Sequence, residues 1–167
     1  MKNEVRQDIQ KMIETNDLEG LLKKVGELHG HYCSHLAYGV KAGHYMLKNI
    51  GSANIGMEEV ITIIETNNCF SDGIQVVTAC TFGNNALIYR DYGKTAVTIS
   101  KRDGKAIRLS LKPSFQESRA DVYPEAMELF EKLVVQRQEG SPEDYEKMNH
   151  LWSEKAFKEL AVPIEEI

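Results

Sequence analysis

Apolar residues recur at helical spacing along most of the first fifty positions. Three series, at residues 5–13, 18–28 and 36–50, place an apolar side chain at every third or fourth position. Gly51 follows the third series, and Lys48 lies near its end, where a positive charge suits the helix dipole. The pattern predicts that the chain begins with helices and that the third ends at Gly51.

Short β-branched runs replace this pattern in the middle of the chain. Val60–Glu65, Ala86–Tyr92, Thr95–Lys101 and Ala106–Leu111 are typical of strands. The turn signal Asp103-Gly104 separates the last two runs, which predicts a β-hairpin.

Further helices are expected between and after these strands. Ser71–Ala79 is predicted to be a helix capped by Ser71. Another begins at Pro124 and is closed by Gly140, and the last follows the capping residue Ser141. The stripe expected to be buried on this last helix consists of Tyr145, Met148, Trp152 and Ala156.

Helices, a small antiparallel sheet and two C-terminal helices predict an α+β fold. A chain of 167 residues and 18.9 kDa fits one domain over 1–167. The net charge of −5 argues against a nucleic-acid partner, and no apolar run is long enough to cross a membrane. The first ten residues lack the apolar run of a secretory signal, and three cysteines do not suit a closed disulfide framework. A cytoplasmic location is expected.

Groups that bind metals or transfer protons concentrate between His29 and His44, which contain four of the five histidines and one cysteine. If this segment were extended, His29, His31 and Cys33 would point the same way, whereas a helix would align His29 with Cys33. Gly30 favours an irregular approach to a helix that begins near Ser34. His44 shares a helix face with apolar residues and is expected to be structural.

Cys69 follows a predicted strand at a polar turn and is a second candidate ligand, with Cys80 a weaker one. Both could instead be small buried residues, which is where free cysteines are usually found. Cys33 beside His31 could also act as a nucleophile with its base. A thiol-redox protein is disfavoured because no two cysteines form a CxxC pair, and no phosphate-binding or serine-hydrolase motif is present.

Three motifs together resemble the core domain of the formylmethanofuran dehydrogenase E-subunit family. They are HGHYC at 29–33, ETNNCFSDGIQVVTACTFG at 65–83 and LIYRDYGK at 87–94. The likeness covers about residues 18–111 and leaves a helical extension over about 121–160. No cysteine follows Cys80, so the Cys-rich zinc module of some relatives is not expected.

The resemblance implies a cleft lined by the first two motifs in a protein that commonly dimerises. The implied metal ligands are His29, His31, Cys33 and Cys69. The implied cleft or supporting residues are Asp72, Gln75, Thr78, Cys80 and Lys94. This chain departs from the family pattern at Ser34-His35, where Pro-Gly is usual, at Ala79, where Gly is usual, and at Asn84-Asn85-Ala86, where a lysine is usual.

Two functions of different class follow from the resemblance. One is a metal-binding accessory protein for a molybdopterin- or tungstopterin-dependent oxidoreductase, in a family related to methanogenesis. The other is a stand-alone metalloenzyme, whose bound metal activates water or polarises a carbonyl. In either case the soft nitrogen and sulfur ligands favour a divalent transition metal, with zinc expected first and nickel or iron as alternatives. A homodimer is expected, and no catalytic residue can be assigned.

Overall fold

The computed structural model of the chain describes residues 4–51, 59–120 and 122–167. Its α-helices are α1 (Gln7–Thr15), α2 (Leu18–His29), α3 (Ser34–Ile50), α4 (Phe70–Thr78), α5 (Pro113–Ala120), α6 (Pro124–Phe130) and α7 (Pro142–Glu159). A 3-10 turn, Glu4–Arg6, precedes α1, and a π-helical turn, Glu131–Val135, follows α6. The strands are β1 (Val60–Ile64), β2 (Leu87–Tyr89), β3 (Ala96–Lys101) and β4 (Ala106–Ser110). These elements confirm the predicted α+β class.

The strands form one mostly antiparallel sheet in the order β2-β1-β3-β4. Antiparallel pairing places Thr62 of β1 opposite Ile99 of β3, and Ile99 opposite Ile107 of β4, so the predicted hairpin is confirmed. The edge strand β2 pairs in parallel with β1 because the chain crosses over through α4 between them. The spacing of apolar residues along the chain does not show that β2 runs parallel to β1.

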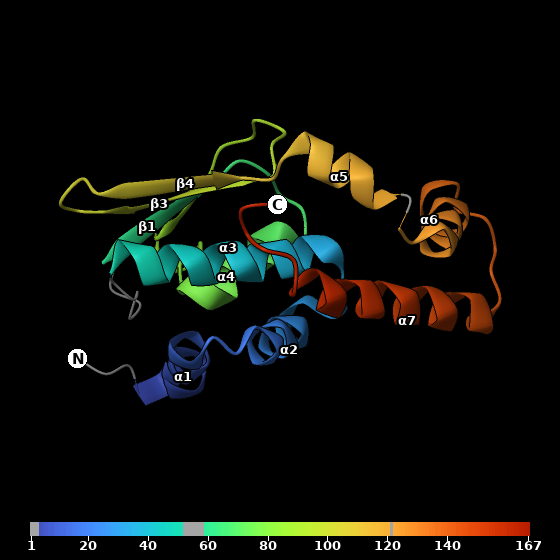
Figure 1. The fold of residues 1–167 in the computed structure, drawn as a ribbon, viewed down its shortest axis with the longest axis horizontal. Helices are drawn as coiled ribbons and strands as arrows, with labels where there is room; N and C mark the ends of the chain where they lie inside the picture. Colours follow the sequence, from blue (N-terminus) through green and yellow to red (C-terminus); the bar gives the residue numbers. More distant parts are fainter. Residues whose placement is uncertain (1–3, 52–58, 121) are drawn as a thin grey trace.

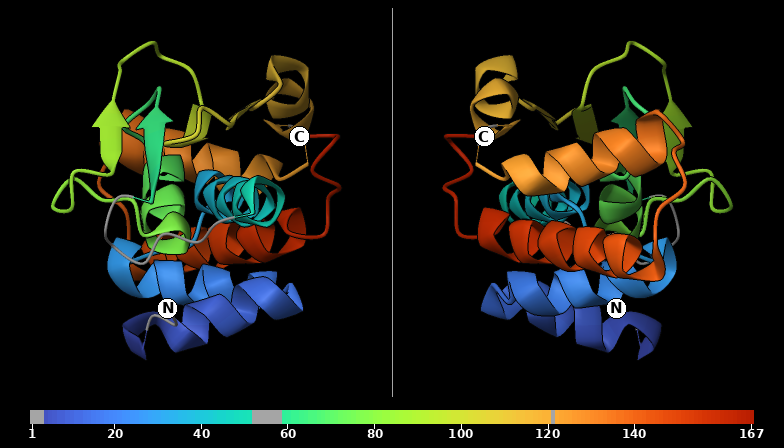
Figure 2. Two further views of the ribbon diagram at one scale, coloured as in Figure 1. Left: turned by 90° about the vertical axis from the view of Figure 1, so that its left-hand side faces the viewer. Right: turned by 90° about the vertical axis from the view of Figure 1, so that its right-hand side faces the viewer.

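Helix α3 lies at the centre of the molecule and contacts α2, α4, α7, β3 and β4. Figure 1 shows the sheet on one side of α3 and α4, with α1 and α2 on the other side. The end-on views in Figure 2 show α6 and α7 at one end of the molecule, with α7 running beside α3. The core is built from the apolar faces of α2, α3 and α4 and from alternate residues of β1.

Two glycines let α3 and α4 approach each other closely. A Cβ atom on Gly39 would lie 2.2 Å from the backbone oxygen of Phe70, and one on Gly73 would lie 2.8 Å from the backbone of Gly39. Such distances exclude any larger residue at these positions without a shift of the helices. The glycine contact brings the beginning of α3 beside the beginning of α4, which are the two places where Cys33 and Cys69 lie.

Local details differ from the sequence-based predictions at the start of α4, in α7 and in the helix from Pro124, which ends in the π-helical turn at Val135 and not at Gly140. Helix α4 begins at Phe70 rather than after Ser71, because Asn68 Oδ1 accepts the Phe70 N–H at 3.0 Å. The hydroxyl of Ser71 instead donates to the backbone oxygen of Thr66. Tyr145, expected in the buried stripe of α7, is 42% exposed. The Ser141 cap is confirmed, since Ser141 and Asp144 form a reciprocal capping box.

Candidate metal centre

The first motif lies in the short connection between α2 and α3. Helix α2 ends at His29, and Gly30 adopts φ 87°, the left-handed region that glycine tolerates. Cys33 is the last residue before α3, in an extended conformation. The irregular approach to a helix at Ser34 is therefore confirmed, and it brings residues 29–33 to the beginning of α4.

The second motif brings Cys69 to the same place from the other side of the core. Cys69 immediately precedes α4, in the loop that leaves the C-terminal end of β1. This loop is anchored where it starts, because the buried Glu65 carboxylate accepts two hydrogen bonds from Arg108 of β4, at 2.7 and 2.8 Å. The Arg108 guanidinium holds the pKa of Glu65 below its usual value.

Four side chains converge between these segments. One nitrogen each of His29 and His31 and the sulfur atoms of Cys33 and Cys69 all lie within 4.8 Å of one another. Cys33 is buried, His29 and Cys69 are partly buried and His31 is exposed. The four atoms are close enough together to hold a single metal ion, and they leave one side of the cluster open.

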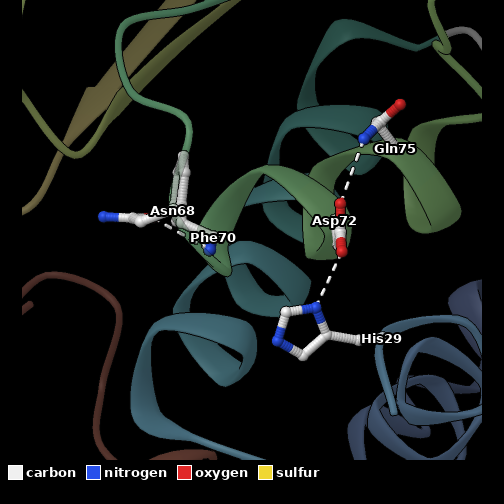
Figure 3. Close-up of polar contacts among 5 residues, drawn as sticks. All are labelled: His29, Asn68, Phe70, Asp72 and Gln75. Carbon is white, nitrogen blue, oxygen red and sulfur yellow. Dashed lines mark hydrogen bonds and ion pairs between the residues drawn. The ribbon is translucent and has the colours of Figure 1, made fainter. Parts of the chain in front are cut away.

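The ring of His29 is held by a carboxylate. His29 Nδ1 lies 2.7 Å from Asp72 Oδ2, and Gln75 Nε2 donates to Asp72 Oδ1 at 3.2 Å, as Figure 3 shows. The other ring nitrogen, Nε2, is buried and has no hydrogen-bond partner among the described residues. A metal-binding histidine typically uses one nitrogen for the ion and the other for a carboxylate. His29 has the arrangement that a metal ligand needs.

The charges of the cluster favour one thiolate. A hydrogen bond from the Cys33 thiol, together with the nearby His29 and His31 rings, lowers the pKa of Cys69 to about 5 against the opposing effect of burial. The same Cys69 thiolate, with burial, raises the pKa of Cys33. Burial disfavours the protonated form of His29, but Asp72 and the Cys69 thiolate outweigh this and raise its pKa. A preformed thiolate beside an unpartnered imidazole nitrogen fits a soft divalent cation.

The cluster opens into a cavity of about 520 Å³. His31, Cys33 and Cys69 line one side of it, and the opposite wall comes from α6, the π-helical turn and α7. The residues of that wall are Phe130, Val134, Met148, Asn149 and Trp152. A smaller cavity of about 350 Å³ reaches His29 and Cys69 from the side of Asp72 and Tyr89.

A model of the family described as "FmdE, Molybdenum formylmethanofuran dehydrogenase operon" matches residues 28–167. This chain belongs to the FmdE family. The match begins just before the first motif and includes α6, the π-helical turn and α7, which form the far wall of the cavity.

The chain is 41% identical over 155 residues to a protein of Archaeoglobus fulgidus described as "Probable S-adenosyl-L-methionine-binding protein". The alignment covers 89% of this chain and 41% of the relative. The chain therefore spans less than half the length of this protein.

The structure separates the other residues implied by the FmdE resemblance. Asp72 and Gln75 support His29 as described above. Thr78 and Cys80 are buried at the opposite end of α4, where the Cys80 sulfur lies 3.7 Å from the backbone oxygen of Val60. The side chain of Lys94 is exposed, and its backbone N–H donates to Glu65. These last three residues lie outside the group of four that converges.

His44 also lies away from the cluster. Its Nε2 is 3.3 Å from the backbone oxygen of Ile13, in the packing between α3 and α1, and burial lowers its pKa. His35 lies beside the cluster but is not part of it, and burial lowers its pKa as well. Within the described residues, no helix is both long and apolar enough to cross a membrane.

The far wall of the cavity could not be recognised from the sequence. Met148 and Trp152 were expected only as buried residues of the last helix, and Phe130 lies in the helix expected from Pro124. All three line the opening beside the cluster. The one available signal was the wide spacing of large apolar residues in the C-terminal helices, and that signal is the same for a core and for a cavity wall.

Proposed function

We propose that this protein binds one divalent transition metal ion, zinc most readily, through His29, His31, Cys33 and Cys69. The observation that carries the proposal is the convergence of four potential ligand atoms, one from each residue, within 4.8 Å of one another, together with the buried, unpartnered Nε2 of His29. Two nitrogen and two sulfur ligands are typical of zinc sites. Nickel and iron are the alternatives that such ligands admit.

Each residue of the site has a distinct role in this proposal. Cys69 supplies a ready thiolate, and Cys33 loses its proton on binding, so metal uptake releases protons. Asp72 fixes the tautomer and the orientation of the His29 ring, and Gln75 fixes Asp72. When bound, the metal supplies either structural cross-linking or a Lewis acid.

The accessory role is the physiological function that we favour. The family description names the operon of a molybdenum formylmethanofuran dehydrogenase, which supports service to a pterin-dependent oxidoreductase. We also propose that two copies of the chain associate, because β2 is an edge strand next to the exposed ring of Tyr92. In this account the protein handles metal or cofactor for its partner enzyme.

A specific observation favours a second function, that of a stand-alone metalloenzyme. Three of the four ligands line a cavity of about 520 Å³, which is within the size range of small-molecule sites. A purely structural site would instead be closed by its four protein ligands. S-adenosyl-L-methionine, named in the description of the relative, is one compound to test for binding there.

Elemental analysis of protein purified without added metal tests the proposal. We expect about one metal ion per chain, and we expect His29→Ala to lose it while His44→Ala keeps it. Fewer than one ion per two chains, with Cys33 and Cys69 both freely titratable, would contradict metal binding. Light scattering at micromolar concentration tests the association, since a mass near 19 kDa would contradict a dimer.

The two functions are then separated on the metal-loaded protein. The accessory role predicts that a tagged copy expressed in the native host co-purifies with a pterin-dependent oxidoreductase. The enzyme role predicts that the isolated protein turns over a small electrophile, such as an activated ester, and loses this activity on chelation. Turnover without a partner would therefore favour the second function over the first.

A further inference from the structure

A second cavity adjoins the one beside the cluster. It has a volume of about 450 Å³ and lies between the beginning of α3 and the helices α5, α6 and α7. His35 and Trp152 line both cavities, so the two meet at these side chains.

The lining of the second cavity contains two buried polar groups with no assigned role. Ser34 Oγ and Trp152 Nε1 are both buried, and neither has a hydrogen-bond partner among the described residues. An indole N–H can only donate a hydrogen bond. A buried donor left without an acceptor loses the hydrogen bond that it makes with water in the unfolded chain, so two such groups in one cavity wall call for an acceptor.

The same wall carries a buried positive charge. Lys155 is 5% exposed, and its ammonium group lies 5.4 Å from the centre of the Trp152 ring. It is the one lysine or arginine among the described residues that line the two cavities. Among the described residues of the lining, the one acid is Glu117, which is exposed. The buried part of the wall therefore combines two donors with a lysine side chain.

We propose that the two cavities bind a small organic carboxylate with an apolar body. Its carboxylate lies at Ser34, Trp152 and Lys155, where one negative charge meets one lysine and two donors. Its apolar body lies between Phe130, Met148 and the Trp152 ring, and its far end faces the cluster. The last part rests on the proposed function, whereas the carboxylate position does not.

The single tryptophan of the chain allows a direct test. Because Trp152 lines both cavities, its fluorescence reports on their contents. We would titrate phenylacetate, and its neutral amide phenylacetamide, into zinc-loaded and chelator-treated protein while zinc content is measured on the same samples. The acid is expected to bind saturably and roughly 10–100-fold more tightly than the amide, because hydrogen bonds to a charged group are the stronger ones.

Matched variants test whether Lys155 contacts the carboxylate. Lys155→Met is expected to weaken phenylacetate binding by about tenfold or more, the effect of losing one charge-assisted contact. Lys158→Met, on the exposed side of the same helix, is expected to leave it unchanged. Trp152→Phe keeps an aromatic ring but removes the N–H, and Ser34→Ala removes the hydroxyl. Calorimetry on both variants provides the readout if Lys155→Met fails to fold.

Three results would overturn the inference. These are equal affinities for the acid and the amide, no saturable change at millimolar concentrations, or an equal loss in Lys155→Met and Lys158→Met. Stoichiometric zinc without carboxylate binding would overturn this inference and leave the proposed function intact. Carboxylate binding by a protein that takes up no zinc would overturn the proposed function and leave this inference intact. Identical affinity with and without zinc would overturn the placement of the far end beside the cluster.

Discussion

Helix α4 has a cysteine near each end, and the two ends of this helix differ in every property that decides what a cysteine can do. Cys69 precedes the first turn, beside two histidines and a second cysteine. Cys80 follows the last turn, fully buried, with its sulfur 3.7 Å from the backbone oxygen of Val60. A helix of nine residues is about 13 Å long, so the two thiols cannot share one metal ion.

The difference between the ends comes from the elements packed against them. The connection between α2 and α3 delivers His29, His31 and Cys33 to the beginning of α4. The end of α4 meets instead the beginning of β1 and the Arg6 guanidinium, which donates to the backbone oxygens of Val76 and Val77. A cysteine acquires its chemistry from the charged and polar groups around it, and burial alone leaves it a small apolar residue.

Exchanging each cysteine separately should give the largest contrast. Cys69→Ser is expected to weaken metal affinity beyond the roughly 10–100-fold loss typical of an outer partner, because it removes a ligand. Cys80→Ala is expected to keep a full metal complement and to lower the free energy of unfolding by about 1 kcal/mol. Metal per chain after dialysis against a weak chelator, with a thermal melt of each variant, provides the comparison. Equal metal loss in both variants would contradict the difference between Cys69 and Cys80.

Thiol labelling of the metal-free protein should separate the two ends by rate. With the pKa of Cys69 near 5, its thiolate predominates at pH 7 and is lost as the pH falls below that value. Iodoacetamide should therefore modify Cys69 at pH 7 and much more slowly at pH 4. Cys80 should react only after unfolding, because it is completely buried. Peptide mass spectrometry gives the order, and zinc should protect Cys69. Faster modification of Cys80 in the folded protein would refute the contrast.

The groups that support His29 should have an intermediate effect. Asp72→Asn is expected to weaken metal binding by roughly 10–100-fold, because the amide no longer holds the His29 ring as a carboxylate does. Gln75→Ala should weaken metal binding less, since Gln75 acts on His29 only through Asp72. His44→Gln is the matched control and should leave the affinity unchanged. A chelator competition titration measures all three, and wild-type affinity in Asp72→Asn would remove the carboxylate from the account.

The smallest effect is expected at the Cys80 end. Ala79 adopts φ 58°, the left-handed region that favours glycine, at the position where the family usually has Gly. Ala79→Gly should relieve this strain and raise the free energy of unfolding by about 0.5–1 kcal/mol, partly offset by the flexibility of glycine. Metal affinity should not change. A lower melting temperature would contradict the strain at Ala79, and altered metal binding would show that the two ends of α4 are coupled.

Most of the helices and the hairpin could be predicted because each leaves a local signal, whereas α5 was not predicted and the full set of converging residues came from the resemblance to the FmdE family. Spacing, a turn dipeptide and a dense group of histidines and cysteines are visible along the chain. The irregular approach to α3 followed from Gly30 alone. What could not be predicted is contact between distant segments. Nothing local indicates that Gly39 and Gly73 would touch, although their contact brings the beginnings of α3 and α4 together.

The cavity and the start of α4 also depend on contacts that the local sequence does not reveal. Trp152 and Met148 have the spacing of a buried stripe, and only the packing of α7 against α6 and the cluster leaves room beside them. Ser71 looked like a helix cap, but the helix begins at Phe70, where Asn68 Oδ1 accepts the Phe70 N–H. The Ser71 hydroxyl donates instead to the backbone oxygen of Thr66, in the loop before the helix.

The most direct test of the central claim is the zinc X-ray absorption spectrum of the zinc-loaded protein. The account predicts a first shell of two sulfur atoms at about 2.3 Å and two nitrogen atoms at about 2.0–2.1 Å. In Cys69→Ser one sulfur should disappear from that shell, and in Cys80→Ala the spectrum should stay unchanged. A shell without sulfur, or one that changes in Cys80→Ala and not in Cys69→Ser, would contradict the assignment of the metal to the His29, His31, Cys33 and Cys69 cluster.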